Sequence, residues 1–298
     1  MIEGILVEGL IYGIMVLGVF ITFRILDFPD LTVDGSFPLG AAIMAILITN
    51  GVNMWLALFV ALGGGLLSGA VTALIHNKLK VPSLLAGILT MTMLYSINIR
   101  VLGNRANLPL LKQETILTRM TFLMEKFVSD EIAILIFFLV VVGVILALFI
   151  LFFHTDLGLT LGALGNNEQM VVTQGVNPEI LKIIGVGIAN GLVAISGAFT
   201  AQYQGFADVS LGQGIIISGL ASVMIGEFLL RSNLIGVLAI RAILGSILFK
   251  GIMYAGRYYG YYINMTPNDL KLITGVLIIL SLVMTKFRNI RMKKRTIQ

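Results

Sequence analysis

The 298 residues include no cysteine and only two histidines, and charged residues make up only 12% of the chain. The absence of cysteine excludes disulfides, thiol catalysis and cysteine metal sites. Two histidines are too few for a histidine metal cluster, so we expect no metal site. A soluble domain carries about 25% charged residues, so this composition excludes an ordinary soluble domain.

Sequence motifs of nucleotide-binding and hydrolytic enzymes are also missing. Gly-Lys never occurs as a dipeptide, which excludes the phosphate-binding pattern G-x-x-x-x-G-K-[ST], and neither H-E-x-x-H nor G-x-S-x-G occurs. We therefore predict that the chain is not an enzyme and carries no cofactor. Any energy from ATP has to enter through another chain.

Apolar residues are abundant instead, at 58% of the sequence. Runs of about 20 apolar residues indicate membrane-spanning helices, whereas a β-barrel shows alternating segments of about 10 residues. The sequence therefore predicts an all-α polytopic membrane protein with about 8–9 transmembrane helices, forming a single domain over residues 1–298. The apolar segments are 5–23, 37–51, 54–75, 82–102, 131–153, 180–202, 212–230, 233–256 and 269–286.

Two of these segments are unusual, because the second is short for a full crossing and the seventh is rich in glycine and polar residues. We expect broken or re-entrant helices there. Glycine also concentrates in two longer segments, where small residues let helices in a bilayer approach closely. These glycines are Gly63, Gly64, Gly65 and Gly69 in the third segment, and Gly185, Gly187, Gly191 and Gly197 in the sixth.

The positive charge concentrates in the tail, residues 286–298. A basic run after a span marks the cytoplasmic side and anionic lipid, and does not indicate nucleic acid. Counting back from a cytoplasmic C-terminus puts the N-terminus outside and loop 103–130 on the extracytoplasmic side. Residues 115–128 of this loop have the apolar spacing of an amphipathic helix, either lying in the membrane interface or docking an external protein.

Residues 155–178, T-D-L-G-L-T-L-G-A-L-G-N-N-E-Q-M-V-V-T-Q-G-V-N-P, interrupt the apolar sequence with a polar segment. Asn166 or Asn167 is placed to cap a short helix. Gly175 is placed to end this helix in a left-handed conformation, and Asn177-Pro178 to begin the next one. A water-exposed helix between two spans requires a partner, and we expect it on the cytoplasmic side.

A six-residue pattern, F-x-D-apolar-[ST]-apolar, occurs at residues 28–33 and again at 206–211. Five predicted crossings separate the two copies, so the copies should have opposite orientation. Inverted repeats with broken helices are typical of transporters, whose path lies at the interface between repeats. A match this short can also arise by chance. The polar residues of this predicted path are Asp30, Thr32, Asp34, Asp208 and Ser210, beside Phe28 and Phe206.

Charged residues also occur inside apolar segments. Arg241 lies in the middle of the eighth segment, where an arginine costs roughly 2.5–3.5 kcal/mol, so it should face protein or water and pair with a carboxylate. We include it among the path residues, although a purely structural role is equally open. The possible partners are Glu8, Asp30, Asp34, Asp208 and Glu227. Lys250 is expected to snorkel to the outer face.

Three stretches carry a resemblance to a known family. Residues 161–177 and 183–201 resemble the permease subunits of ABC importers of the branched-chain amino acid and ribose type. Residues 28–42, F-P-D-L-T-V-D-G-S-F-P-L-G-A-A, look like the subgroup of amino-acid ABC permeases associated with tryptophan or tyrosine uptake. The likeness runs through most of the chain, including N-L-P-L-L at residues 107–111.

The resemblance implies a permease homodimer in the cytoplasmic membrane, with cytoplasmic ATPase subunits that hold ATP and Mg²⁺ and an extracytoplasmic solute-binding protein. It further implies that a coupling helix enters a groove on the ATPase, although the chain has Asn-Asn-Glu-Gln where many ABC importers have Glu-Ala-Ala. The implied solute is a small molecule, an amino acid of the aromatic or branched-chain type. The coupling residues are Asn166, Asn167, Glu168, Gln169, Met170, Gln174 and Gly175.

A second hypothesis is a secondary transporter that works alone on an ion gradient. It would rely on titration of buried carboxylates such as Asp34 or Glu227.

Overall fold

The computed structural model describes residues 2–111, 113–230 and 234–260, together with positions 272, 275, 276 and 279. The regular secondary structure of these residues is helical apart from two short strands. The elements in chain order are α1 (Ile2–Phe20), the π-helical turn η1 (Ile21–Ile25), α2 (Val33–Thr49), α3 (Met54–Leu79), α4 (Ser83–Val101), β1 (Asn107–Pro109), α5 (Ile116–Met124), α6 (Asp130–Phe153), α7 (Asp156–Asn166), α8 (Glu168–Thr173), α9 (Pro178–Gln204), β2 (Phe206–Asp208), the 3-10 turn η2 (Val209–Gly212), α10 (Ile215–Leu229) and α11 (Ile235–Gly260).

Seven helical segments among the described residues are long and apolar enough to cross a membrane, and α2 is a shorter apolar helix. These eight match the first eight predicted segments, and the ninth, 269–286, lies outside the described residues apart from isolated positions. The predicted all-α polytopic membrane fold is confirmed. The two unusual segments are also irregular, because α2 is only 17 residues long with Pro38 inside it, and α10 begins after a 3-10 turn.

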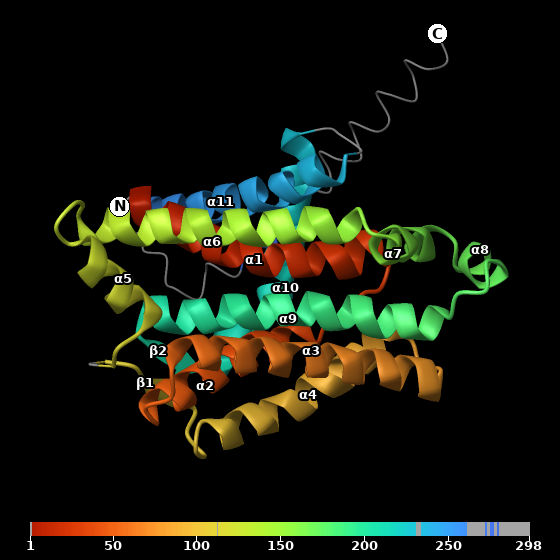
Figure 1. The fold of residues 1–298 in the computed structure, drawn as a ribbon, viewed down its shortest axis with the longest axis horizontal. Helices are drawn as coiled ribbons and strands as arrows, with labels where there is room; N and C mark the ends of the chain where they lie inside the picture. Colours follow the sequence, from red (N-terminus) through yellow and green to blue (C-terminus); the bar gives the residue numbers. More distant parts are fainter. Residues whose placement is uncertain are drawn as a thin grey trace, which may run out of the picture.

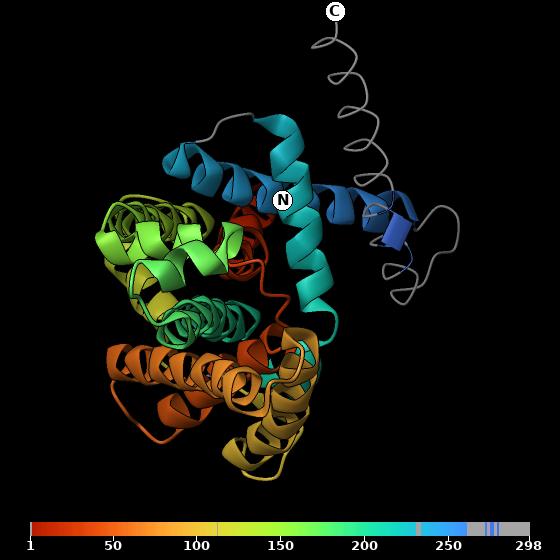
Figure 2. The same ribbon diagram turned by 90° about the vertical axis from the view of Figure 1, so that its right-hand side faces the viewer.

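The long helices lie side by side, with α7 and α8 at one end of the bundle and α5, β1 and β2 at the other (Figure 1). We call these the α8 end and the strand end. At the strand end β1 pairs with β2 in antiparallel register, with Leu108 opposite Ala207. Seen from the α8 end, α10 crosses steeply beside helices that are viewed nearly end-on (Figure 2).

Helix α5 forms within the predicted amphipathic stretch. Thr115 caps it by accepting a hydrogen bond from the Thr118 amide. Ile116 and Leu117 are buried, whereas Leu123 and Phe127 are exposed. An exposed apolar surface of this kind suits both the interfacial and the docking interpretation.

Helices α1 and α9, which precede the two copies of the repeat, run antiparallel. The Ser196 hydroxyl on α9 donates to the Ile11 carbonyl on α1. Further along α1, Gly18 packs against the backbone of Ala189, which precedes Ser196 on α9. At a helical rise of about 1.5 Å per residue, the two contacts lie about 11 Å apart on each helix. The five apolar helices α2, α3, α4, α6 and α9 lie between the two copies. The copies therefore follow helices of opposite direction, which agrees with the predicted inverted orientation.

Glycines set the distance between α3 and α9. A Cβ atom on Gly65 would lie 2.6 Å from the Cβ of Ala194 and closer still to the carbonyl oxygen of Asn190. A Cβ atom on Gly69 would likewise come too close to the carbonyl oxygen of Val186, whereas a Cβ atom on Gly63 would have no neighbour within 4 Å. Close backbone contact lets helices in a bilayer recover dispersion energy. The predicted role of glycine in close packing is therefore realised at Gly65 and Gly69, but not at Gly63.

Replacing Gly65 by valine is expected to lower the free energy of unfolding by about 3 kcal/mol, because the new side chain has to push α3 away from α9. The change is measured by thermal or denaturant unfolding of the purified protein in detergent. Gly63→Val, on the same helix, is the matched control and should change the stability by less than about 0.5 kcal/mol. Equal stability of the two variants would contradict the packing role of Gly65.

Candidate functional site

Each turn of the polar segment 155–178 is held by a local cap. Thr155 caps α7, and the Asn167 side chain accepts a hydrogen bond of 3.1 Å from the Met170 amide to cap α8. Gly175 adopts the left-handed conformation, with φ of +80°. Asn177 then caps α9, which begins with Pro178. The predicted short helix is confirmed, and of the two candidate caps the structure selects Asn167, while Asn166 ends α7.

Helix α8 is attached to the bundle by one buried side chain, Val171. Its neighbours Met170 and Val172 are each 52% exposed. Helix α7, by contrast, packs tightly, since Leu161 and Leu164 are buried and Gly165 lies against the backbone of Ile25. The result is a short helix that projects an apolar surface from a firmly packed base.

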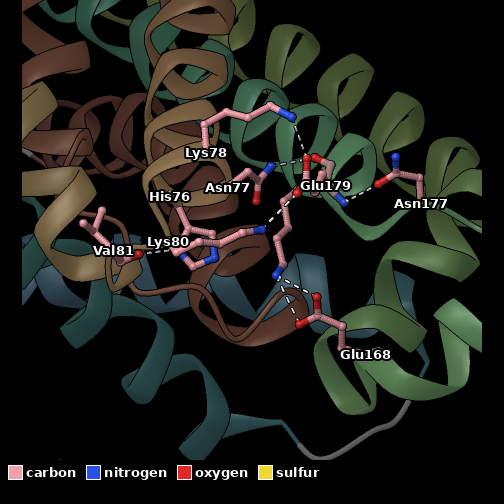
Figure 3. A network of polar contacts seen from close by, with 9 residues as sticks. His76, Asn77, Lys78, Lys80, Val81, Glu168, Asn177 and Glu179 are labelled. Carbon is pink, nitrogen blue, oxygen red and sulfur yellow. Dashed lines mark hydrogen bonds and ion pairs between the residues drawn. The ribbon is translucent and has the colours of Figure 1, made fainter.

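Ion pairs surround the base of α8 (Figure 3). Lys182 on α9 donates to both carboxylate oxygens of Glu168 on α8, at 3.0 and 3.1 Å. Glu179, at the start of α9, pairs with Lys78 and Lys80 at the end of α3, at 3.1 Å each. Exposed pairs contribute only about 0–1 kcal/mol each, so their main effect is to fix the orientation of α8, α9 and α3 relative to one another.

A second polar cluster is completely buried between α2, α3 and α9. Its centre is Asp30, whose carboxylate accepts hydrogen bonds from the Thr32 amide at 2.9 Å and from the Asn190 side chain at 2.7 Å. Asn190 in turn accepts from Ser36 at 2.7 Å, and the hydroxyls of Thr32 and Thr72 are 2.7 Å apart. A polar group removed from water has to keep its hydrogen bonds, so this cluster requires one specific arrangement of the three helices.

The two copies of the repeat share a local structure. In each copy the aspartate accepts a hydrogen bond from the amide two residues later: Asp30 from Thr32, and Asp208 from Ser210 at 2.7 Å. The surroundings differ, because Asp30 is fully buried whereas Asp208 is partly exposed beside Asn107 of β1. Partial burial acts to raise the pKa of the Asp208 carboxyl, but hydrogen bonds from Ser210 and Asn107 outweigh it and hold that pKa below its usual value.

Asp34 connects the first turn of α2 to the beginning of α10. Its carboxylate accepts hydrogen bonds from the amides of Gly214 and Ile216, at 3.0 and 2.9 Å, at the beginning of α10. A carboxylate at this position satisfies amides that have no partner inside the helix. Asp34 also lines a cavity of about 380 Å³ together with Tyr95 and Asn98.

Arg241 pairs with Glu227, at 3.3 Å, and Glu227 also accepts from Arg24 at 2.5 Å. The structure thus selects one partner from the five carboxylates that the sequence offered. Side chains of α11, α10 and η1 meet in this three-residue cluster. The intramembrane arginine is thereby paired with a protein carboxylate, as its insertion cost requires.

The predicted path residues therefore do not gather at a single site. Phe28, Asp30 and Thr32 belong to the buried cluster and its edge, Asp34 lines a cavity, and Phe206, Asp208 and Ser210 lie at the strand end. Arg241 lies with Glu227 and Arg24. Their role in a path stays a prediction.

Sequence reasoning did not find a larger cavity, of about 550 Å³, at the strand end. Lys250 lies in its wall and pairs with Glu8 at 3.1 Å, instead of snorkelling alone to the membrane surface. The available signal was that Glu8 and Lys250 are opposite charges inside two apolar segments. Such charges should be paired with each other whenever their helices are neighbours.

A polytopic helical membrane protein with an inverted repeat, and with a short capped helix projecting at one end, has the architecture of a solute permease. The sequence matches the family described as "Branched-chain amino acid transport system / permease component" over residues 1–282. The chain belongs to this family, which confirms the resemblance found in the sequence.

Individual relatives agree with this assignment. The chain is 39% identical to a tyrosine transport system permease protein of Clostridioides difficile (strain R20291), covering 98% of this chain and 94% of that protein. It is 32% identical to the uncharacterized protein RP368 of Rickettsia prowazekii (strain Madrid E), covering 92% and 94%. It is 26% identical to the ribose import permease protein RbsC of Escherichia coli (strain K12), covering 72% and 67%.

A solved structure, described as PsaBC from Streptococcus pneumoniae in complex with Fab, has a related fold. The TM-score is 0.53, over 93% of this chain and 89% of that one, at 15% sequence identity. This likeness concerns the fold alone.

Proposed function

We propose that the chain is the membrane-spanning subunit of an ATP-binding-cassette importer, and that it moves an amino acid across the cytoplasmic membrane by alternating access. Membership of the permease family supports the transport role. The chain has no nucleotide-binding motif, so ATP and Mg²⁺ belong on a separate ATPase subunit.

The observation that carries the proposal is α8, a capped helix with exposed Met170 and Val172 at the end of the bundle. Exposed apolar side chains outside the membrane are typical of a surface that another protein covers. A helix fixed by Asn167, Gly175 and the Glu168–Lys182 pair transmits a push as a rigid body. We therefore assign α8, with residues Asn166 to Gly175 around it, as the coupling helix that binds the ATPase.

The solute we propose is an amino acid, and an aromatic one in particular. The support is the tyrosine transport permease, which is similar over nearly the whole of both chains, whereas the ribose permease is more distant. An importer of this class works as a permease homodimer with an extracytoplasmic binding protein. With α8 in the cytoplasm, the strand end faces outside, the N-terminus lies outside and the C-terminal tail lies in the cytoplasm.

The four lysine and arginine side chains Arg24, Lys78, Lys80 and Lys182 lie around the α8 end. Arg100, Arg105, Arg119 and Lys126 lie in or beside loop 103–130 at the other end, so the proposed orientation rests on the basic tail 286–298, because positive residues concentrate on the cytoplasmic side. The ion-driven alternative relies on Asp34 or Glu227. Asp34 is held by two amides and Glu227 by two arginines, so each carboxylate already has structural partners within the protein.

The test is uptake of radiolabelled L-tyrosine by proteoliposomes that contain the permease with an ABC ATPase and a solute-binding protein from the same organism. We expect uptake that requires ATP inside the compartment facing the ATPase, and that persists when ion gradients are collapsed by ionophores. Uptake by the permease alone, driven by an ion gradient, would overturn the proposal in favour of a secondary transporter.

A further inference from the structure

The larger cavity lies at the strand end, between the first half of α1, the end of α9, the beginning of α10 and the second half of α11. Its volume of about 550 Å³ falls within the range of roughly 300–1,000 Å³ that is typical of small-molecule sites. It lies at the opposite end of the bundle from α8. In the orientation proposed above, it faces the side from which an imported solute arrives.

Charges of both signs line this one cavity. The carboxylates are Glu3, Glu8 and Glu131, and the cations are Lys250 and Arg257. Lys250 donates to the Glu8 carboxylate at 3.1 Å, which uses one of the three N–H groups of its ammonium. Charged groups in membrane-spanning helices are costly and usually mark a functional path.

Aromatic rings lie next to these charges. The Lys250 ammonium lies 3.3 Å from the centre of the Tyr12 ring, an attractive cation–π contact. Tyr203 on α9 and Tyr254 on α11 belong to the same wall, with the buried Phe249 beside them. The cavity thus offers flat apolar surface next to both an anionic and a cationic group.

We propose that this cavity binds the transported solute as a zwitterion with an aromatic side chain. The inference rests on the proposed function and names the solute class and its binding residues. Lys250 and Arg257 bind the carboxylate of the solute, Glu8 binds its ammonium group, and the tyrosine rings pack against its side chain. A neutral sugar has no charge to match this lining, so the cavity favours an amino acid over a ribose-like solute.

The experiment measures binding of three probes to the purified permease–ATPase complex in lipid nanodiscs. The probes are L-tyrosine, tyramine, which lacks the carboxylate, and 3-(4-hydroxyphenyl)propionate, which lacks the amine. We expect Lys250→Met to weaken L-tyrosine and the propionate about tenfold or more, and tyramine less than twofold, because a hydrogen bond to a charged group is lost only for the first two. Lys250→Arg should restore much of the affinity.

Glu8→Gln should give the complementary pattern, weakening L-tyrosine and tyramine but not the propionate. Lys126→Met, which removes a lysine from the loop after α5, is the matched control and should change none of the three affinities. If a single variant is poorly folded, the double variant Glu8→Gln/Lys250→Met removes both charges of the pair together. This double variant should bind L-tyrosine only weakly, and it should bind tyramine and the propionate with similar affinities.

Equal weakening of all three probes by Lys250→Met would overturn the inference, because it would make the Glu8–Lys250 pair purely structural. Unchanged binding in every variant would overturn it as well. In both cases the wild-type complex would still take up L-tyrosine in the uptake assay, so the proposed function would stand. A wild-type complex that binds and imports ribose, but no amino acid, would overturn the solute class in both proposals.

Discussion

Replacing Asp30 by alanine is expected to lower the free energy of unfolding by about 3 kcal/mol or more. The carboxylate accepts hydrogen bonds from the Thr32 amide and the Asn190 side chain, and all three residues are fully buried. Alanine leaves two donors without a partner in a place that water does not reach, and each stranded donor costs about 1–3 kcal/mol. Denaturant or thermal unfolding in detergent measures the loss.

The second copy of the repeat provides a matched control. Asp208 makes the same contact to the amide two residues later, but it is partly exposed, so water can replace the lost hydrogen bond. Asp208→Ala should therefore cost only about 1 kcal/mol, the usual contribution of a cap. Similar losses in both variants would show that burial of the first copy is not what makes Asp30 important.

The second large effect is expected at α8, where Met170→Asp should abolish co-purification of the ATPase and reduce ATP-driven uptake by more than tenfold. Removing one central apolar contact costs about 2 kcal/mol at an interface, roughly 30-fold in affinity, and a buried charge adds to this. The helix itself should persist. Its cap Asn167 and its buried anchor Val171 are unchanged, and an aspartate in the first turn interacts favourably with the helix dipole.

Phe127→Asp is the control for this prediction. It introduces the same charge at an exposed apolar residue, 85% exposed, but at the strand end of the bundle. The ATPase should co-purify with this variant as it does with the wild type. Loss of the ATPase from both variants, or from neither, would contradict the assignment of α8 as the coupling helix.

Local sequence signals accounted for much of the structure. Asn167, Gly175, Asn177 and Pro178 are placed by their own backbone preferences, and the structure uses each of them as expected. The membrane-spanning helices could also be predicted from the apolar segments, because a backbone in lipid has to satisfy its hydrogen bonds within a helix of sufficient length. The short second segment and the irregular seventh segment were apparent for the same reason.

Contacts between residues far apart in the chain could not be predicted from such local signals. The sequence offered five carboxylates for Arg241, and only the packing of α10 against α11 selects Glu227. Lys250 was expected to reach the membrane surface by itself, but α1 brings Glu8 within 3.1 Å of it. The six-residue repeat did not reveal that one aspartate is buried and the other is partly exposed.

The sequence by itself thus determined the class of the protein, the approximate limits of the eight apolar helices among the described residues, and the capped helix between α7 and α9. Each of these depends on hydrogen bonds and apolar surface within a short stretch of chain. Only the tertiary structure decided which charges pair, which copy of the repeat is buried and where the cavities lie. These features depend on which helix faces come together. In a bilayer the helix faces are brought together by close packing at residues such as Gly65 and Gly69. A glycine in the sequence shows that some helix can approach closely, but it does not show which one.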